Sequence, residues 1–167
     1  MDTPKLSPTE RLILANQYKI LAQTEAEGMD TSTYENKAEI LLRGYTGLYH
    51  MVFDSLSEEE PESITDEVHD ILSMFQIIEG ATSSLSDEQK QQLNMSKLTF
   101  SGFDGNNDDH YHQTRFMVNN LEYYEGLGYD INSHTSSSLP RYRRQLAVFK
   151  TFTGELSISD LNQIAAA

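Results

Sequence analysis

One loop of this chain carries side chains that could hold a cation. Asp104, Asn106 and Asp108 alternate as the first three ligands of an EF-hand calcium loop do. That loop also requires glycine at its sixth position and a bidentate glutamate at its twelfth, where this chain has Asp109 and Arg115. The calcium pattern is therefore incomplete, and the three alternating residues are candidates for a weak cation site only.

The same loop can also be interpreted as the turn that precedes a helix. The Gly-Asn-Asn run at 105–107 consists of residue types that favour turns, and Asn107 or Asp108 could cap a helix that begins there. Acidic side chains beside the first turn would complement the helix dipole. We predict this capped helix over 108–125. An enzyme or a small-ligand or cation binder that uses the 104–112 loop is the alternative.

Two pairs of acid and histidine have a spacing that metal sites use. Asp66 and His69, and likewise Asp109 and His112, are three residues apart, which places an acid and an imidazole one helical turn apart. Each residue turns a helix by about 100°, however, and this rotation places Asp66 and His69 away from the apolar stripe of their own helix. We therefore predict that this pair faces solvent and binds no metal.

The sequence has no signature of catalysis or of cofactor binding. It contains zero cysteines, which excludes disulfides, thiolate zinc sites and cysteine nucleophiles. It has neither the nucleophile elbow of serine hydrolases nor the glycine fingerprint of a nucleotide site. We accordingly assign no catalytic residue and no cofactor, and we favour a protein that is not an enzyme.

The composition is that of an acidic globular protein. Hydrophobic residues make up 38% and charged residues 23% of the 167 residues, which is enough for a buried core. The formal net charge of -14 would repel a phosphate backbone, so we expect no nucleic-acid partner. No apolar run is long enough for a membrane span, and the start MDTPKLSPTERL lacks the features of a secretory signal. We expect a cytoplasmic protein with no membrane partner.

Helix-start signals and apolar periodicity predict an all-α fold. In a capping box, a Ser or Thr side chain and an acid or amide three residues later satisfy each other's backbone N–H groups. Five such boxes recur along the chain, and the apolar residues from Ile64 to Ile78 repeat with the period of a helix. We predict a single multi-helical domain over residues 1–167, with about six to eight helices.

The positions of these signals divide the chain as follows. The boxes run from Ser7 to Glu10, Ser32 to Glu35, Ser57 to Glu60, Ser86 to Gln89 and Ser157 to Asp160. Glycine is a common helix terminator, and we expect Gly28 and Gly44 to end the first two helices. Further helices are expected near 87–95, 140–152 and 158–165. The segment 128–140 is a long connection rich in Ser, Asn and Gly, and is either a partner-binding loop or a mobile one.

The helix predicted over 108–125 is apolar on two sides. The first side holds Tyr111, Met117, Val118 and Leu121, and the second holds His112, Phe116 and Tyr123. A helix of this kind is either central in a bundle or shared with a partner.

Charge is also distributed unevenly along the chain. Residues 54–70 contain eight acids without any Lys or Arg, whereas 141–150 holds four of the twelve basic residues. Opposite charges of this kind can steer two copies of one chain together. We predict a homo-oligomer, and keep a partner protein that binds the acidic segment as an alternative. The interface candidates are Phe116, Tyr123, Arg141, Arg143 and Arg144.

Several segments of the chain resemble the YfbU family of bacterial proteins. These segments are ERLILANQYKIL (10–21), RGY (43–45), FSGFDGNN (100–107), RFMV (115–118) and LNQI (161–164). The resemblance runs nearly from end to end. It implies an all-helical, cytosolic bacterial protein that oligomerises, and it brings neither an established activity nor catalytic residues.

Overall fold

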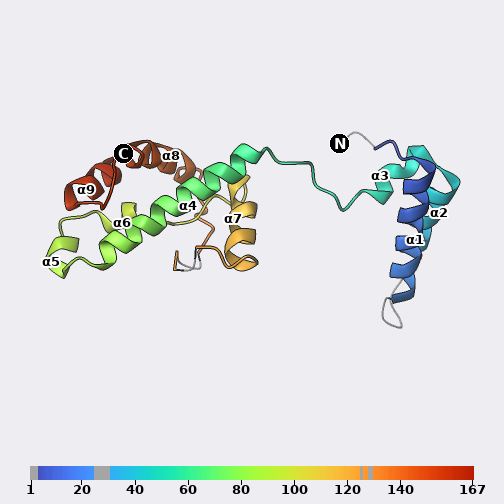
Figure 1. Ribbon diagram of the computed structural model, residues 1–167, viewed down its shortest axis with the longest axis horizontal. Coiled ribbons are helices and arrows are strands. Elements are labelled where there is room, and N and C mark those ends of the chain that lie inside the picture. Colours follow the sequence, from blue (N-terminus) through green and yellow to red (C-terminus); the bar gives the residue numbers. More distant parts are fainter. Residues whose placement is uncertain (1–3, 25–30, 125, 128–129) are drawn as a thin grey trace. The chain divides into compact units, whose positions relative to one another are not determined.

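The computed structural model of the chain describes residues 4–24, 31–124, 126–127 and 130–167. The all-α class is confirmed: in the described residues the elements are α-helices α1 to α9 and one 3-10 helix, η1, and β pairing is limited to a parallel bridge between Phe103 and Asn132. The chain forms two compact units, Met1–Glu59 and Glu60–Ala167, both visible in Figure 1. Each unit is described by itself, and a single domain over 1–167 stays a prediction.

The N-terminal unit is a pair of helices with a short helical extension. Its elements are α1 (Pro8–Thr24), α2 (Ser32–Arg43), η1 (Thr46–Leu48) and α3 (Tyr49–Val52), and α1 packs along α2 (Figure 1). Its buried hydrophobic residues are Ala15, Ala38, Ile40, Leu41, Tyr49 and Val52. The hydroxyl of Tyr18 donates to the Val52 carbonyl at 2.9 Å, which ties α1 to α3.

The C-terminal unit is built along one long helix. Its elements are α4 (Glu62–Ser83), α5 (Asp87–Lys90), α6 (Met95–Leu98), α7 (His110–Asn119), α8 (Ser138–Phe149) and α9 (Ile158–Ala166). Helix α4 contacts α6, α7 and α8, while α9 packs on α8 and α6 (Figure 1). Helix α4 therefore supplies the common surface on which α6, α7 and α8 assemble.

An aromatic cluster fills the centre of this unit. Phe75 of α4 lies 4.9 Å from the ring of Tyr142 in α8 and 5.5 Å from Phe100, measured between ring centroids. Phe103 completes the cluster at 5.5 Å from Phe100, with the edge-to-face geometry that aromatic pairs prefer. The apolar stripe predicted on α4 is confirmed, since Val68, Ile71, Leu72, Phe75 and Ile78 are all buried.

Three of the five predicted capping boxes are present. Glu10 N–H donates to Ser7 Oγ at 3.3 Å, while the Glu10 carboxylate accepts from Ser7 N–H at 2.7 Å. The boxes at Ser86 and Ser157 have the same reciprocal bonds. Gly44 ends α2 as predicted, with φ 70° and its N–H donating to the carbonyls at the end of the helix. Gly28 lies outside the described residues.

The predicted boxes at Ser32 and Ser57 are wrong. Helix α2 begins at Ser32 itself, behind Thr31. Helix α4 begins five residues after Ser57, behind Pro61. The cause at Ser57 is steric, because a residue that precedes proline is driven out of the helical region, so a helix that starts at Ser57 could not continue through Glu60.

Two predicted helices are shorter than expected. The helix predicted over 108–125 covers only His110–Asn119, because Glu122 and Tyr124 have positive φ values of 56° and 58° and the chain leaves the helical path there. The helix predicted near 87–95 is two separate turns, α5 and α6. Within the described ranges, no helix has both the length and the apolar content that a membrane span requires.

Candidate functional site

The loop that holds the cation candidates is fastened to the segment 131–134. The Phe103 N–H donates to the Ile131 carbonyl at 3.0 Å, and the Ser133 N–H donates to the Phe103 carbonyl at 2.8 Å. Gly102 has φ +84°, and a Cβ added there would lie 2.3 Å from the carbonyl carbon of Ile131. Only glycine fits this close approach, so Gly102 fixes the path of the loop.

Asp104 is buried, with 4% of its surface exposed, and its carboxylate is occupied within the loop. One oxygen accepts from the Asn106 N–H at 3.0 Å and the other from the Asn107 side-chain amide at 2.7 Å. These two hydrogen bonds, with attraction to His134, hold the pKa of Asp104 below its ordinary value. The loop therefore folds around the Asp104 carboxylate.

The prediction that Asn107 or Asp108 caps the following helix is wrong. The Asp108 carboxylate accepts from the Asp104 N–H at 2.9 Å, and Asn107 donates to the Asp104 carboxylate. Helix α7 begins behind Asp109, whose side chain makes no capping hydrogen bond. The Asp108 side chain bonds to Asp104 instead of to the start of α7, because the buried N–H of Asp104 needs a hydrogen-bond acceptor.

The weak cation site at Asp104, Asn106 and Asp108 stays a prediction. The Asn106 side chain is exposed, while the Asp104 and Asp108 carboxylates already accept hydrogen bonds from the loop. Across the part of the chain that the structure describes, no group of three or more His, Cys, Asp and Glu side chains is placed to hold a metal ion.

One of the two acid and histidine pairs differs from its prediction. Asp66, Asp109 and His112 are exposed. His69 is half-buried, and its Nδ1 lies 2.6 Å from the Tyr124 hydroxyl. The prediction that His69 faces solvent is wrong, because the chain after α7 folds back and covers it with a tyrosine.

The structure brings together a triad of Glu67, His110 and Arg143, from α4, α7 and α8, in which His110 is buried, Glu67 is half-buried and Arg143 is exposed. Arg143 donates from Nε and Nη2 to the two Glu67 oxygens, at 2.7 Å each. His110, which is 4% exposed, places Nε2 2.8 Å from Glu67 Oε2, and its Nδ1 is buried without a hydrogen-bond partner. The Arg143 hydrogen bonds, the His110 hydrogen bond and both charges lower the pKa of Glu67 to about 2.

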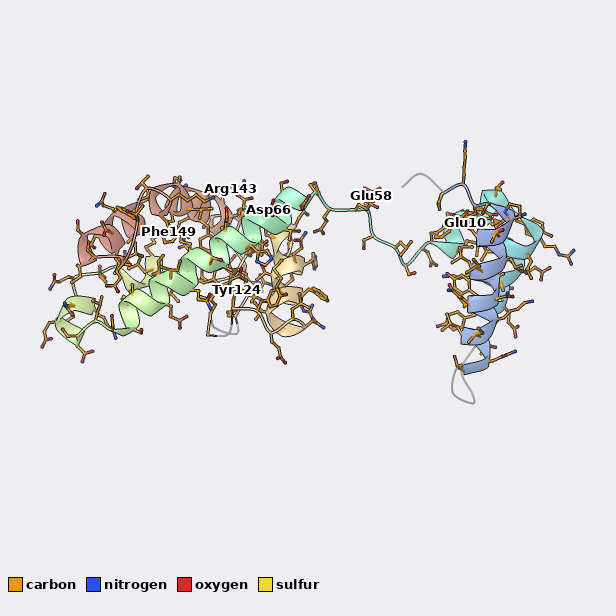
Figure 2. All side chains as sticks on the ribbon, viewed as in Figure 1. Glu10, Glu58, Asp66, Tyr124, Arg143 and Phe149 are labelled. Atoms are coloured by element: carbon orange, nitrogen blue, oxygen red, sulfur yellow. The ribbon has the colours of Figure 1, made fainter. Side chains whose placement is uncertain are left out.

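This triad lies along an open groove of about 620 Å³. Figure 2 labels two of the lining side chains, Asp66 on α4 and Arg143 on α8. Lys150 contributes a second cation and is paired with Asp70. The remaining walls are acidic, uncharged polar or apolar, from Ser63, Ile64, Asn107, Asp108, Asp109, Leu139 and Leu146. Both cations are thus neutralised within the groove, and acids are in excess.

Sequence reasoning missed Glu67 and His110, although a local signal was available for each. Glu67 lies between Ile64 and Ile71 at helical spacing, so it occupies the edge of the apolar stripe of α4. His110 precedes the apolar Met117 by seven residues, so the two lie on the same face of α7. A polar residue that interrupts an apolar face indicates a buried polar contact. Neither signal could identify the partner.

The predicted interface residues do not form one cluster of free side chains. Phe116 and Tyr123 are 55% and 49% exposed at and after the end of α7. Each of the three arginines donates within the unit. Arg141 bonds the Ser101 hydroxyl, Arg143 bonds Glu67 and Arg144 bonds the Ala167 carbonyl. Because the second side of α7 is exposed, this helix is not central in the unit. That the second side of α7 faces a partner stays a prediction.

Most of the exposed large hydrophobic residues in the described part of the chain belong to the N-terminal unit. Nine large hydrophobic side chains there are at least 41% exposed, against six buried hydrophobic residues. The nine are Leu12, Ile13, Ile20, Leu21, Leu42, Tyr45, Leu48, Met51 and Leu56. The described part of the larger C-terminal unit has only four, Ile77, Phe116, Leu121 and Tyr123.

The model of the YfbU domain matches residues 4–167. The chain belongs to the YfbU family. A curated relative, the UPF0304 protein MJECS11 of Methanocaldococcus jannaschii, is 32% identical over 153 residues, which cover 87% of this chain and 88% of the relative. The predicted family is confirmed. Since this relative is archaeal, membership of the YfbU family alone does not indicate a bacterial source, and neither name states an activity.

Proposed function

We propose that this YfbU-family protein is a self-associating interaction protein, located in the cytoplasm, whose N-terminal unit supplies the interface. The observation that carries the proposal is the ratio, among the described residues of that unit, of nine large exposed to six buried hydrophobic residues. Each half-exposed Leu or Ile that becomes buried would contribute on the order of 1 kcal/mol. Isolated apolar side chains are normal on a surface, but a concentration of this size in one small unit is typical of an interaction site.

The distribution of charge supports the same surface. The protein has a formal net charge of -14, which keeps copies apart wherever their surfaces carry that charge. Helix α1 has no charged residue between Arg11 and Lys19. Association of like molecules is therefore least opposed along this helix.

The oligomeric mass tests the proposal. Light scattering at micromolar concentration should give a multiple of the 19.0 kDa chain mass. Replacing both Ile13 and Ile20 with Lys should reduce the mass to that of one chain, because four charges would enter the contact of a dimer. The matched control is Phe116→Lys, an equally exposed position in α7. If Phe116→Lys dissociates the oligomer and the double variant does not, the interface lies at α7 instead.

A second candidate function is ligand or cation binding at the 104–112 loop and the adjoining groove. The observation in its favour is the triad of Glu67, His110 and Arg143 beside a groove of about 620 Å³. Calcium titration followed by NMR tests the cation part of this candidate. Calcium binding would move the backbone amides of 104–110, and amides that stay in place at millimolar calcium would reject it.

A further inference from the structure

Helix α1 has two apolar faces, and only one of them packs inside its unit. Ala15 is fully buried, and Leu14 and Tyr18 pack beside it. Ile13 and Ile20 are 51% and 57% exposed, and lie within about 20° of each other on the opposite face. The outward face of α1 is therefore an apolar stripe with no partner in the described part of its own unit.

The residues of this outward face are arranged symmetrically about the middle of the helix. The midpoint between Asn16 and Gln17 is also the midpoint between Ile13 and Ile20, between Leu12 and Leu21, and between Thr9 and Thr24. All eight residues are exposed. The arrangement is also symmetric around the helix axis. Viewed along that axis, Asn16 and Gln17 lie about 50° to either side of the isoleucine stripe, and Leu12 and Leu21 lie about 90° to either side.

The symmetry belongs to the outward face alone. About the same midpoint, Arg11 corresponds to Ala22 and Leu14 corresponds to Lys19, so the pairs outside the outward face do not match. The remaining outward pair is Glu10 and Gln23, which are similar in size and differ in charge. Since the matching is confined to the unpartnered face, it cannot arise from packing within the unit.

From this pattern we infer that α1 pairs antiparallel with α1 of a second copy, across a two-fold axis that passes between Asn16 and Gln17. This inference rests on the proposed self-association and specifies its geometry. In an isologous contact, a residue i that touches j requires j to touch i. An antiparallel pair about this axis places Ile13 against Ile20 of the partner subunit, and places the amides of Asn16 and Gln17 around the axis, where they can hydrogen-bond their symmetry mates.

The pattern favours the antiparallel pair over a parallel one. A parallel two-fold pair places each residue beside its own copy, so it needs no symmetry along the helix. In an antiparallel pair, residues at equal distances on either side of the midpoint contact each other, so an apolar residue at one position needs an apolar residue at the other, as Ile13 and Ile20 provide here. Antiparallel helices also bring opposite ends of their macrodipoles together, whereas parallel helices align them.

Disulfide trapping tests the register directly, because the 167-residue chain has zero cysteines and an introduced thiol has no competitor. Ile13→Cys and Ile20→Cys are prepared separately and oxidised with copper phenanthroline, either alone or as a mixture. The mixture should form a disulfide-linked dimer. Each variant alone should form little, since its own copy lies about 10 Å away along the helix axis, which is too far for a disulfide. Gln17→Cys should crosslink alone, because it lies beside the axis.

Lys19→Cys is the matched control, since Lys19 is exposed on the same helix but about 110° from the isoleucine stripe. It should not crosslink. Self-crosslinking by Ile13→Cys would show a parallel pair and overturn the inference. An oligomer whose mixture does not crosslink would also overturn it, while leaving the proposed self-association intact. If the unmodified protein has the mass of one chain, both the antiparallel pairing and the proposed self-association are contradicted.

Discussion

Replacing Glu67 with glutamine should destabilise the C-terminal unit by about 1.5 kcal/mol at pH 7. The hydrogen bonds and charges of Arg143 and His110 lower the pKa of Glu67 from 4.5 to about 2. A shift of that size is equivalent to roughly 3 kcal/mol of stability. The Arg143 side chain is 54% exposed, so water screens part of the attraction, and we retain about half of the figure.

The pH dependence of this loss identifies its cause. A carboxyl group whose pKa is lowered by folding stabilises the protein fully above its ordinary pKa, and loses that contribution as the pH falls toward the folded value. The difference between the original protein and Glu67→Gln should therefore be largest at pH 7, and should shrink between about pH 4.5 and about pH 2. Urea unfolding followed by near-ultraviolet circular dichroism of the tyrosines measures this difference at each pH.

Lys150→Gln is the control for this measurement. Lys150 pairs with Asp70 nearby, but the two side chains are 57% and 48% exposed, so its loss should change stability by less than about 0.5 kcal/mol. The reasoning is refuted if Glu67→Gln is no more destabilising than Lys150→Gln at pH 7. It is also refuted if the loss from Glu67→Gln is the same at pH 3 as at pH 7, since a packing defect would not depend on ionisation.

Two further predictions concern the loop that borders the groove. Gly102→Ala should destabilise the protein by about 3 kcal/mol or more, because the added Cβ would clash with the Ile131 backbone. Gly154 has the same φ but open space around it, so Gly154→Ala should cost about 1 kcal/mol. Thermal unfolding compares the two variants, and equal losses of stability would contradict the steric argument. Tyr142→Phe should cost about 1 to 3 kcal/mol, because the fully buried hydroxyl donates to the Gly102 carbonyl and accepts from the Ser101 N–H, each at 3.0 Å. Hydrogen exchange should then show faster exchange at the Ser101 amide, and unchanged exchange would contradict that role.

The all-helical fold could be predicted because its signals are local. The boxes at Ser7, Ser86 and Ser157 each need only residues three positions apart, and the stripe on α4 needs only the helical period. The same local rule also predicted capping boxes at Ser32 and Ser57, and both of these predictions are wrong. A capping box describes what a helix start can use, and Pro61 decided where α4 begins.

The triad could not be predicted because its members are distant in sequence. Glu67 is 43 residues from His110 and 76 from Arg143. The positions of Glu67 and His110 on their helices could have indicated buried polar contacts. Which polar groups meet, however, depends on how α4, α7 and α8 pack, and periodicity within one helix does not determine this packing.

The apolar residues of α1 show the same limit. The capping box at Ser7 predicts where this helix starts, but it does not show whether Leu12, Ile13, Ile20 and Leu21 face the core or solvent. The structure places the small Ala15 inside, where α2 can approach closely, and leaves the larger side chains outside. The symmetry of the outward face is present in the sequence. It indicates a contact between copies only because the structure shows that this face is exposed.

Native mass spectrometry of the purified 167-residue chain tests self-association most directly. At micromolar concentration we predict a multiple of 19.0 kDa, and we predict that Ile13→Lys combined with Ile20→Lys returns the mass to 19.0 kDa. A mass of 19.0 kDa for the unmodified protein would contradict the proposed function.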